Sequence, residues 1–488
     1  MSLLRNSAIY TLGGFLPKVV SFLLLPVVTR YLALEDYGIV TALLAVTAFV
    51  GIFASLQLPG SGMFRCYFDY AHEADRRRFV GTIVGAVLVV NLLVTGLCFA
   101  ARPLLQLLYP SISFYPYYTI ALLTVPLSSL VDVFQILFRL KEKPLPFVFI
   151  SSLAFLLNIG FLLWFVVGLR GGAEGMLWAG LAGQAATIPV ALWIARHEFH
   201  WSWSTPMFRN ALSYSLQSIP YMLSGILMTN VDRYLVNRLS STYELGLYGS
   251  AWRLASVFNL LIGAVAMSYD PFFMRTACDP DQKAARMILG ATGTRIILGF
   301  CFLGFAGILF AGAVVHLMMA PQYYAVAAVL PFMIAGMVVG VGDYVGSMGA
   351  KFAKKQIWFT PVYLAATLLN ALLDWLLVPQ WGAVGAAVAG MLCAGATMLL
   401  RFACSQRFWP VPLDFRSIFA AGSLCLFAGL AVWWIPGLWG WFARAAACIA
   451  GGLYIFHRMD GWPLVSRLCQ MLGFPSFFWR INKDRKTG

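Results

Sequence analysis

Residues 172–183 read GAEGMLWAGLAG, and residues 382–390, about 210 positions later, read GAVGAAVAG in the same kind of apolar context. Two similar halves in membrane-spanning sequence are typical of alternating-access transporters, whose substrate site lies at the interface between the halves. Other residues repeat in the same order at nearly the same spacing: Pro17 with Pro220, Arg30 with Arg233, Asp132 with Asp343, Lys143 with Lys354, and Asn158 with Asn370.

Composition predicts that both halves are embedded in a membrane. Hydrophobic residues make up 61% of the 488 and charged residues only 11%, whereas soluble domains carry about 25% charged residues. The expected fold is an all-α polytopic membrane protein with about 14 transmembrane helices of spanning length. The apolar stretches lie at residues 7–32, 38–61, 79–101, 116–139, 146–168, 175–195, 211–238, 246–269, 288–312, 326–349, 357–378, 383–403, 417–436 and 438–457.

The repeat divides this chain into four predicted parts. Residues 1–200 form an N-terminal six-helix bundle, and residues 201–405 form a second bundle that repeats the first. Both bundles have an even number of spans and enter from the same side, so the repeats are parallel. Residues 406–457 add two further helices, and residues 458–488 form a basic, aromatic cytoplasmic tail suited to a membrane surface.

The distribution of basic residues predicts the orientation. With both termini placed in the cytoplasm, most of the 34 Lys and Arg residues fall in inner loops and tails, as the positive-inside rule requires. The net charge of +15 is then explained by topology and by anionic inner-leaflet lipid. Nucleic acid is therefore not an expected partner.

Several classes of function are disfavoured. The outer loops are short, and no extramembrane segment is long enough for a soluble catalytic fold, so the chain is not expected to be an enzyme. No GxxxxGK[ST] loop for binding nucleotide phosphates is present. The nine Cys are scattered without a CxxC pair and the five His do not cluster, so neither a metal site nor a disulfide is expected.

Basic residues inside the spans carry the functional prediction. A charge near the centre of a spanning helix costs roughly 2.5–3.5 kcal/mol and usually faces a cavity or a partner. Lys18 and Arg253 lie too deep to reach water easily, so they are the leading candidates for a cavity that binds an anionic substrate. Further candidates for the same cavity are Arg30, Arg65, Asp232 and Arg233, which lie nearer the helix ends, and Arg295 in the ninth span. For the arginines among them, the alternative is that they only anchor the helices at the interface.

Acidic and polar residues provide candidate sites for ion coupling. Asp374 follows Asn370 by one helical turn, which places both on one face. Asp132 and Asp343 lie about two turns from the inner ends of their spans. Ion coupling and simple charge pairing both remain open for these residues. Pro17 and Pro220 occupy equivalent places in the first helix of each half and are either hinges or static kinks.

These features resemble one family, the polysaccharide exporters of the multidrug/oligosaccharidyl-lipid/polysaccharide (MOP) superfamily, and in particular its Wzx-type flippases. Two passages carry the resemblance: NSAIYTLGGFLPKVVSFLLLPVVTRYLALEDYGIV at residues 6–40 and NVDRYLVNRLSSTYELGLYGSAWRLASVFN at residues 230–259. The pairing of Asp232-Arg233 with Gly246-x-Tyr248-x-x-Ala251-x-Arg253 is the most specific element. The resemblance covers essentially the whole chain.

The resemblance implies a flippase that moves an undecaprenyl-diphosphate-linked oligosaccharide from the inner to the outer leaflet of a bacterial inner membrane. Cations on spans 1, 2 and 8 would hold the diphosphate. Span 1 would contribute Lys18 or Arg30, span 2 would contribute Arg65, and span 8 would contribute Arg253. No cofactor is implied beyond coupling to H⁺ or Na⁺ and the membrane potential. A working monomer is expected, with membrane lipid, a polysaccharide polymerase and a chain-length regulator as partners.

Three alternatives remain open. A drug or cation antiporter of the same fold should carry an acidic cavity, which Lys18 and Arg253 argue against. A lipid II flippase is the most easily confused relative. A membrane enzyme of polysaccharide assembly should carry a large outer loop, which this chain lacks.

Overall fold

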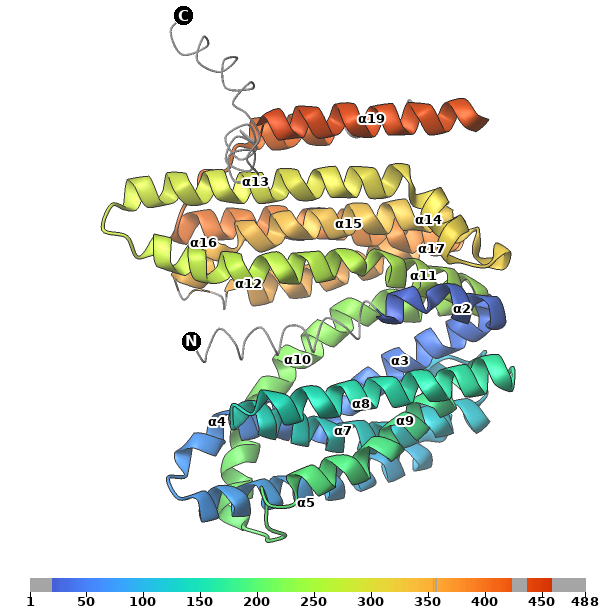
Figure 1. Ribbon diagram of the computed structural model, residues 1–488, viewed down its shortest axis with the longest axis vertical. Coiled ribbons are helices and arrows are strands. Elements are labelled where there is room, and N and C mark those ends of the chain that lie inside the picture. Colours follow the sequence, from blue (N-terminus) through green and yellow to red (C-terminus); the bar gives the residue numbers. More distant parts are fainter. Residues whose placement is uncertain (1–19, 354, 356–357, 424–436, 459–488) are drawn as a thin grey trace, which may run out of the picture. The chain divides into compact units, whose positions relative to one another are not determined.

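A computed structural model describes residues 20–353, 355, 358–423 and 437–458, and within them every regular element is helical (Figure 1). The expected all-α membrane fold is confirmed. The α-helices are α2 (Leu25–Tyr31), α3 (Leu34–Ser55), α4 (Phe64–Cys66), α5 (Glu73–Ala100), α6 (Arg102–Leu108), α7 (Thr119–Leu140), α8 (Pro144–Leu162), α9 (Gly172–Ala195), α10 (Thr205–Leu239), α11 (Thr242–Ala255), α12 (Val257–Ala277), α13 (Gln282–Leu309), α14 (Ala311–Met318), α15 (Val326–Gly346), α16 (Met348–Phe352), α17 (Phe359–Phe408) and α19 (Gly437–Arg458). Short turns of other helix types are η1 (Leu58–Met63), η2 (Tyr67–Asp69), η3 (Phe114–Tyr118), η4 (Leu163–Gly168) and η5 (Pro321–Tyr323).

Nine helical stretches among the described residues are long and apolar enough to cross a membrane, which makes the chain a multi-pass membrane protein. One of them, α17, contains two predicted spans, because Gly382 breaks its 50 residues with φ 54° and ψ −131°. The 35-residue α10 contains the predicted span 211–238, but it is not among these nine stretches. The predicted span 7–32 is described only from residue 20, so Pro17 and Lys18 lie outside the described residues.

Two compact units make up the chain. The first comprises residues 1–256, 315–329 and 363–390, and the second comprises residues 257–314, 330–362 and 391–488. In the first unit α5, α7, α8 and α9 pack against one another (Figure 1), around a core that includes Phe79, Phe134 and Phe138. In the second, α13 lies beside α19 (Figure 1), and Tyr269 and Phe273 form a separate core.

The repeated small-residue motif has the same local geometry in both places. Gly172 and Gly382 are the glycines with positive φ among the described residues, at 55° and 54°. A left-handed backbone suits glycine because it has no Cβ, and each glycine here starts a new helical segment. Three residues later, a Cβ on Gly175 would lie 2.8 Å from the Phe165 carbonyl oxygen, and one on Gly385 would lie 2.5 Å from that of Leu377. The motif therefore serves close backbone packing in both halves.

Candidate functional site

A cluster of buried polar side chains joins three helices of the first unit. Asp232 comes from α10, Tyr248 from α11, and Asn370 and Asp374 from α17; Asp232, Asn370 and Asp374 are 8%, 5% and 0% exposed. The Tyr248 hydroxyl donates to Asp232 Oδ2 at 2.5 Å, and the Asn370 amide donates to Asp232 Oδ1 and to Asp374 Oδ2, the latter at 3.3 Å. The one-turn spacing of Asn370 and Asp374 aims both at Asp232.

This acid cluster, as we call these four residues, has the donors of a small-cation or proton site. Two carboxylates cannot both stay charged in an apolar interior without a counter-charge. Asp374 Oδ1 is buried and has no hydrogen-bond partner among the described residues. Carboxylate, amide and hydroxyl oxygens are the ligands that hard cations prefer, and a single shared proton would also satisfy the pair.

Arg233 and Arg253 lie close to this cluster in sequence but differ in their contacts. The Arg233 guanidinium lies 5.2 Å from the centre of the Trp252 ring and donates to Asn230 Oδ1 at 3.0 Å. Arg253 is half-buried on α11, and its guanidinium has no hydrogen bond or ion pair within the described part of the chain. Of the two, Arg253 is therefore the one available to an anion.

The other predicted cations are spread over the chain. Arg30 ends α2 and is exposed. Arg65 is exposed and pairs with Asp69 at 2.7 Å. Arg295 is exposed on α13, in the second unit.

The predicted hinge residue Pro220 lies inside α10, which continues through it. The roles of these cations in binding and of Pro220 in hinge motion remain predictions.

The two repeat-related aspartates have different surroundings. Asp343 pairs with Arg401 of α17, whose guanidinium lies 4.4 Å from the centre of the Phe359 ring. Asp132 is exposed on α7, and its side chain makes no hydrogen bond or ion pair among the described residues. The sequence did not single out Arg401, because 58 residues separate it from its partner.

A set of contacts joins the two predicted halves at one end of the helices. The distribution of basic residues predicts that this end faces away from the cytoplasm. The Gln322 amide donates to the carbonyl oxygens of Thr29 and Leu32 at 3.0 and 2.9 Å, and the Tyr323 hydroxyl donates to that of Leu32 at 2.9 Å. Nearby, the Ser111 and Thr242 hydroxyl oxygens are 3.0 Å apart. We call these six residues the outer junction; all of them belong to the first unit. Sequence reasoning missed them because none carries a charge.

Two glycines bring α3 and α11 together beside this junction. A Cβ on Gly38 would lie 2.0 Å from the Thr242 carbonyl oxygen, and one on Gly246 would lie 2.0 Å from that of Leu34. The contact is reciprocal, as expected for equivalent helices of two repeats. Only glycine allows this approach at either position.

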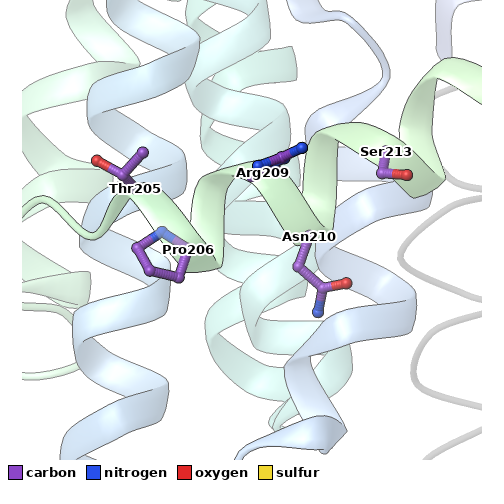
Figure 2. Close-up of a pocket in the computed structure, with 5 residues that line it drawn as sticks. All are labelled: Thr205, Pro206, Arg209, Asn210 and Ser213. Carbon is purple, nitrogen blue, oxygen red and sulfur yellow. The ribbon is translucent and has the colours of Figure 1, made fainter.

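A shallow pocket of about 490 Å³ lies at the start of α10, and Figure 2 shows the side chains that line it. Its lining comes from one helix: Thr205, Pro206, Arg209, Asn210 and Ser213. Arg209 gives it a positive charge, but both Arg209 and Asn210 are exposed. The pocket lacks the buried polar groups of the acid cluster.

Comparisons with known proteins agree on family and fold. A family model described as polysaccharide biosynthesis protein matches residues 3–277. The probable low-salt glycan biosynthesis flippase Agl15 of Haloferax volcanii is 21% identical over 292 residues, which are 59% of this chain and 57% of that protein. The matched part thus spans little more than half the length of this curated relative.

Solved structures share the fold at low identity. The lipid II flippase MurJ in an inward closed conformation has a TM-score of 0.69 at 14% identity, covering 93% of this chain and 100% of its own. A multidrug resistance MATE family transporter of the MOP superfamily, facing inward, has a TM-score of 0.57 at 15% identity, covering 77% and 93%. These likenesses show a shared fold, and the predicted relationship to a polysaccharide family is confirmed by the family match. The family match extends over more than half of the chain, and the chain belongs to the polysaccharide biosynthesis protein family.

Proposed function

We propose that this protein is a flippase that moves an undecaprenyl-diphosphate-linked oligosaccharide from the inner to the outer leaflet of a bacterial inner membrane, with both termini in the cytoplasm. The observation that carries the proposal is the match to the polysaccharide biosynthesis family in a chain built from membrane-spanning helices. The proposed activity is transport and not catalysis. The transported oligosaccharide would be used to build surface polysaccharide.

The charged residues support an anionic cargo. Arg253 is half-buried, and the described residues leave its guanidinium without an acidic partner. Arginine binds phosphate oxygens through a planar fork of donors. Outward movement of a diphosphate across a membrane whose inside is negative is electrically favourable, by about 2.3 kcal/mol per charge for each 100 mV crossed. Arg253, with Lys18 or Arg30 and Arg65, is the proposed diphosphate site.

The acid cluster is proposed to bind the coupling ion, H⁺ or Na⁺. It is separate from the proposed diphosphate site because carboxylates repel phosphate. Ion binding there would neutralise Asp232 and Asp374 and favour the packing of α10, α11 and α17 around them. Release of the ion would leave two buried like charges, which disfavours that packing.

A deletion strain tests the proposed function. Loss of the protein should remove the surface polymer and leave intact lipid-linked oligosaccharide accumulating inside, as mass spectrometry of extracted lipid would show. Wild-type protein should restore the polymer, whereas Arg253→Ala, expressed at the same level, should not. Unchanged polymer and lipid pools in the deletion strain would reject this function.

The fold also admits a lipid II flippase, because the MurJ structure is similar over 93% of this chain. Rescue of a strain depleted of its lipid II flippase distinguishes the two. Rescue would favour lipid II as the cargo. Failure to rescue, together with loss of surface polymer in the deletion strain, would favour the lipid-linked oligosaccharide.

A further inference from the structure

A polar stripe runs along α7 through most of its length. Thr124, Ser128, Asp132, Gln135 and Arg139 follow one another at spacings of three and four residues. At 100° per residue they fall within an arc of about 80° on one face of the helix. Asp132 and Arg139 are exposed, and the other three are partly exposed.

The rest of α7 is occupied by packing. Its buried residues include Val125, Val133 and Phe134, and the helix contacts α3, α5, α8 and α9. Thr124 and Ser128 donate to carbonyl oxygens of their own helix, those of Ile120 and Val125, both at 2.9 Å. Their oxygens keep free lone pairs, which can still accept hydrogen bonds.

The three remaining stripe residues are not used by the described structure. The side chains of Asp132, Gln135 and Arg139 make no hydrogen bond or ion pair with any described residue. An aspartate held against lipid is costly, so such a residue normally faces water or a partner. The stripe therefore has the character of a wall that faces an aqueous space.

The equivalent helix of the second half shows that this stripe is not an architectural requirement. The matching positions are Ala335, Val339, Asp343 and Gly346 in α15 and Ala350 in the short helix α16, so four of the five polar residues are absent. There the aspartate is held by Arg401, whereas the position matching Arg401 in the first half is the buried Ala191. The fold thus pairs one aspartate internally and leaves the other available.

We propose that the α7 stripe contacts the sugar part of the cargo and helps to select it; this inference rests on the proposed function. A sugar presents many hydroxyl groups, and a carboxylate accepts two of them while an amide both donates and accepts. Thr124 and Ser128 add acceptors in line with them. Such hydrogen bonds favour a cargo that carries sugar over one that does not, while movement of the lipid diphosphate itself does not depend on them.

Cysteine labelling tests the first step, that the stripe faces water. Single cysteines at Ser128 and Gln135, in full-length protein lacking its native cysteines, should react with a membrane-impermeant thiol reagent in proteoliposomes. Leu156→Cys, at an exposed apolar position of α8, is the control and should remain unlabelled. Unreactive cysteines at both stripe positions would overturn the proposal.

Transport with two probes tests the contact with sugar. Undecaprenyl diphosphate that carries a trisaccharide is compared with bare undecaprenyl diphosphate in proteoliposomes. Asp132→Asn combined with Gln135→Met should slow transport of the trisaccharide probe about ten-fold or more, because the variant loses hydrogen bonds from sugar hydroxyls to a charged carboxylate and to an amide. The rate for the bare probe should stay unchanged. Ser129→Ala, which alters a buried residue of the same helix off the stripe, should preserve both rates.

Failure of the inference and failure of the proposed function look different. If wild-type protein moves neither probe, the flippase function itself is wrong. If wild type moves both and the double variant keeps the wild-type ratio of the two rates, the flippase stands and the α7 stripe is not a sugar surface. Protection of Gln135→Cys from labelling by the trisaccharide probe, but not by the bare probe, would support the contact without relying on transport.

Discussion

Asp374 is fully buried, and its charge has the clearest expected consequence of any single residue. Asp374→Asn keeps the shape of the side chain and removes one of two adjacent carboxylates. Transport that depends on Na⁺ or on a pH gradient should lose that dependence and slow at least ten-fold, while the midpoint of thermal unfolding should stay equal or rise, since a buried charge is costly.

The control for Asp374→Asn is Glu174→Gln, which neutralises an exposed carboxylate at the start of α9. This control should keep the wild-type dependence on Na⁺ and pH. Rates would be measured in proteoliposomes with imposed ion gradients. An Asp374→Asn protein that still responds to both gradients would show that the acid cluster does not couple transport.

The ion pairs of a second residue, Glu198, lead us to expect that the stability of the folded protein depends on pH. It lies after α9, 13% exposed, and accepts from Lys141 Nζ and Lys143 Nζ, both at 2.5 Å. Burial raises the pKa of Glu198, but the two lysines outweigh burial, so its pKa is lowered overall. A carboxyl whose folded pKa is lowered stabilises the protein above its unfolded pKa of about 4.3, and this contribution is lost as pH falls through the folded pKa.

Glu198→Gln should therefore lower the unfolding midpoint at pH 7 and have less effect near pH 3. Removing one partner of a largely buried pair costs about 3 kcal/mol. The matched control is Glu73→Gln, which also loses a contact to Lys141 but whose side chain is 47% exposed, so a smaller loss is expected. Equal losses at pH 3 and pH 7 would contradict the ionic explanation.

The contacts of single residues were only partly predictable from sequence. One-turn spacing correctly placed Asn370 and Asp374 on one face, because helical periodicity is local. Their contact with Asp232, 138 residues before Asn370, depends on how α10 packs against α17, which no local pattern encodes. Tyr248 stood within the motif that carried the family resemblance, yet its hydrogen bond to Asp232 appears only in the fold.

At the scale of elements, substitutions in the repeated glycine motif can distinguish the effect of a positive φ angle from the effect of an added side chain. Gly382→Ala should cost about 1–2 kcal/mol for the left-handed backbone alone, and the added Cβ would also lie 2.4 Å from Glu244 Oε2. Gly390→Ala, in the same motif, meets no atom within 4 Å and should stabilise by up to about 1 kcal/mol through helix propensity.

The same pair of substitutions can be made in the first half. Gly172→Ala should destabilise and Gly180→Ala should not, because a Cβ at Gly172 would lie 2.9 Å from Asp36 Oδ2 and one at Gly180 meets nothing. Thermal unfolding of the four purified variants measures both pairs. If Gly172→Ala is as stable as Gly180→Ala, and Gly382→Ala is as stable as Gly390→Ala, the positive φ angles do not constrain these helix starts.

Elements were predicted better than their contacts. Hydrophobic length placed the membrane helices, because each must be long and apolar by itself. The motif at residues 382–390 correctly divided α17 into two spans, since Gly382 breaks the helix where the second copy of the motif begins. The reciprocal close contacts of Gly38 and Gly246 were not predicted. Each glycine is required only because the backbone of the other helix lies beside it, and the local sequence does not encode that contact.

At the scale of the whole molecule, the outer junction bears on alternating access. If the predicted halves separate at their outer ends to release cargo, the contacts of Gln322 and Tyr323 with Leu32 must break in each cycle. The Ser111 and Thr242 oxygens are 3.0 Å apart, and side chains this close suit replacement by a disulfide-forming cysteine pair. Ser111→Cys with Thr242→Cys should therefore form a disulfide that holds the junction closed.

Oxidation of this double variant, made without the native cysteines, should stop transport of the lipid-linked probe, and reduction should restore it. Each single cysteine should transport normally under both conditions, which controls for oxidation elsewhere. The cross-link is confirmed separately by a mobility shift on non-reducing gels after cleavage at a protease site inserted between residues 111 and 242. A cross-linked protein that transports at the wild-type rate would show that the outer junction stays closed throughout the cycle, and release would then require a path that leaves these contacts intact.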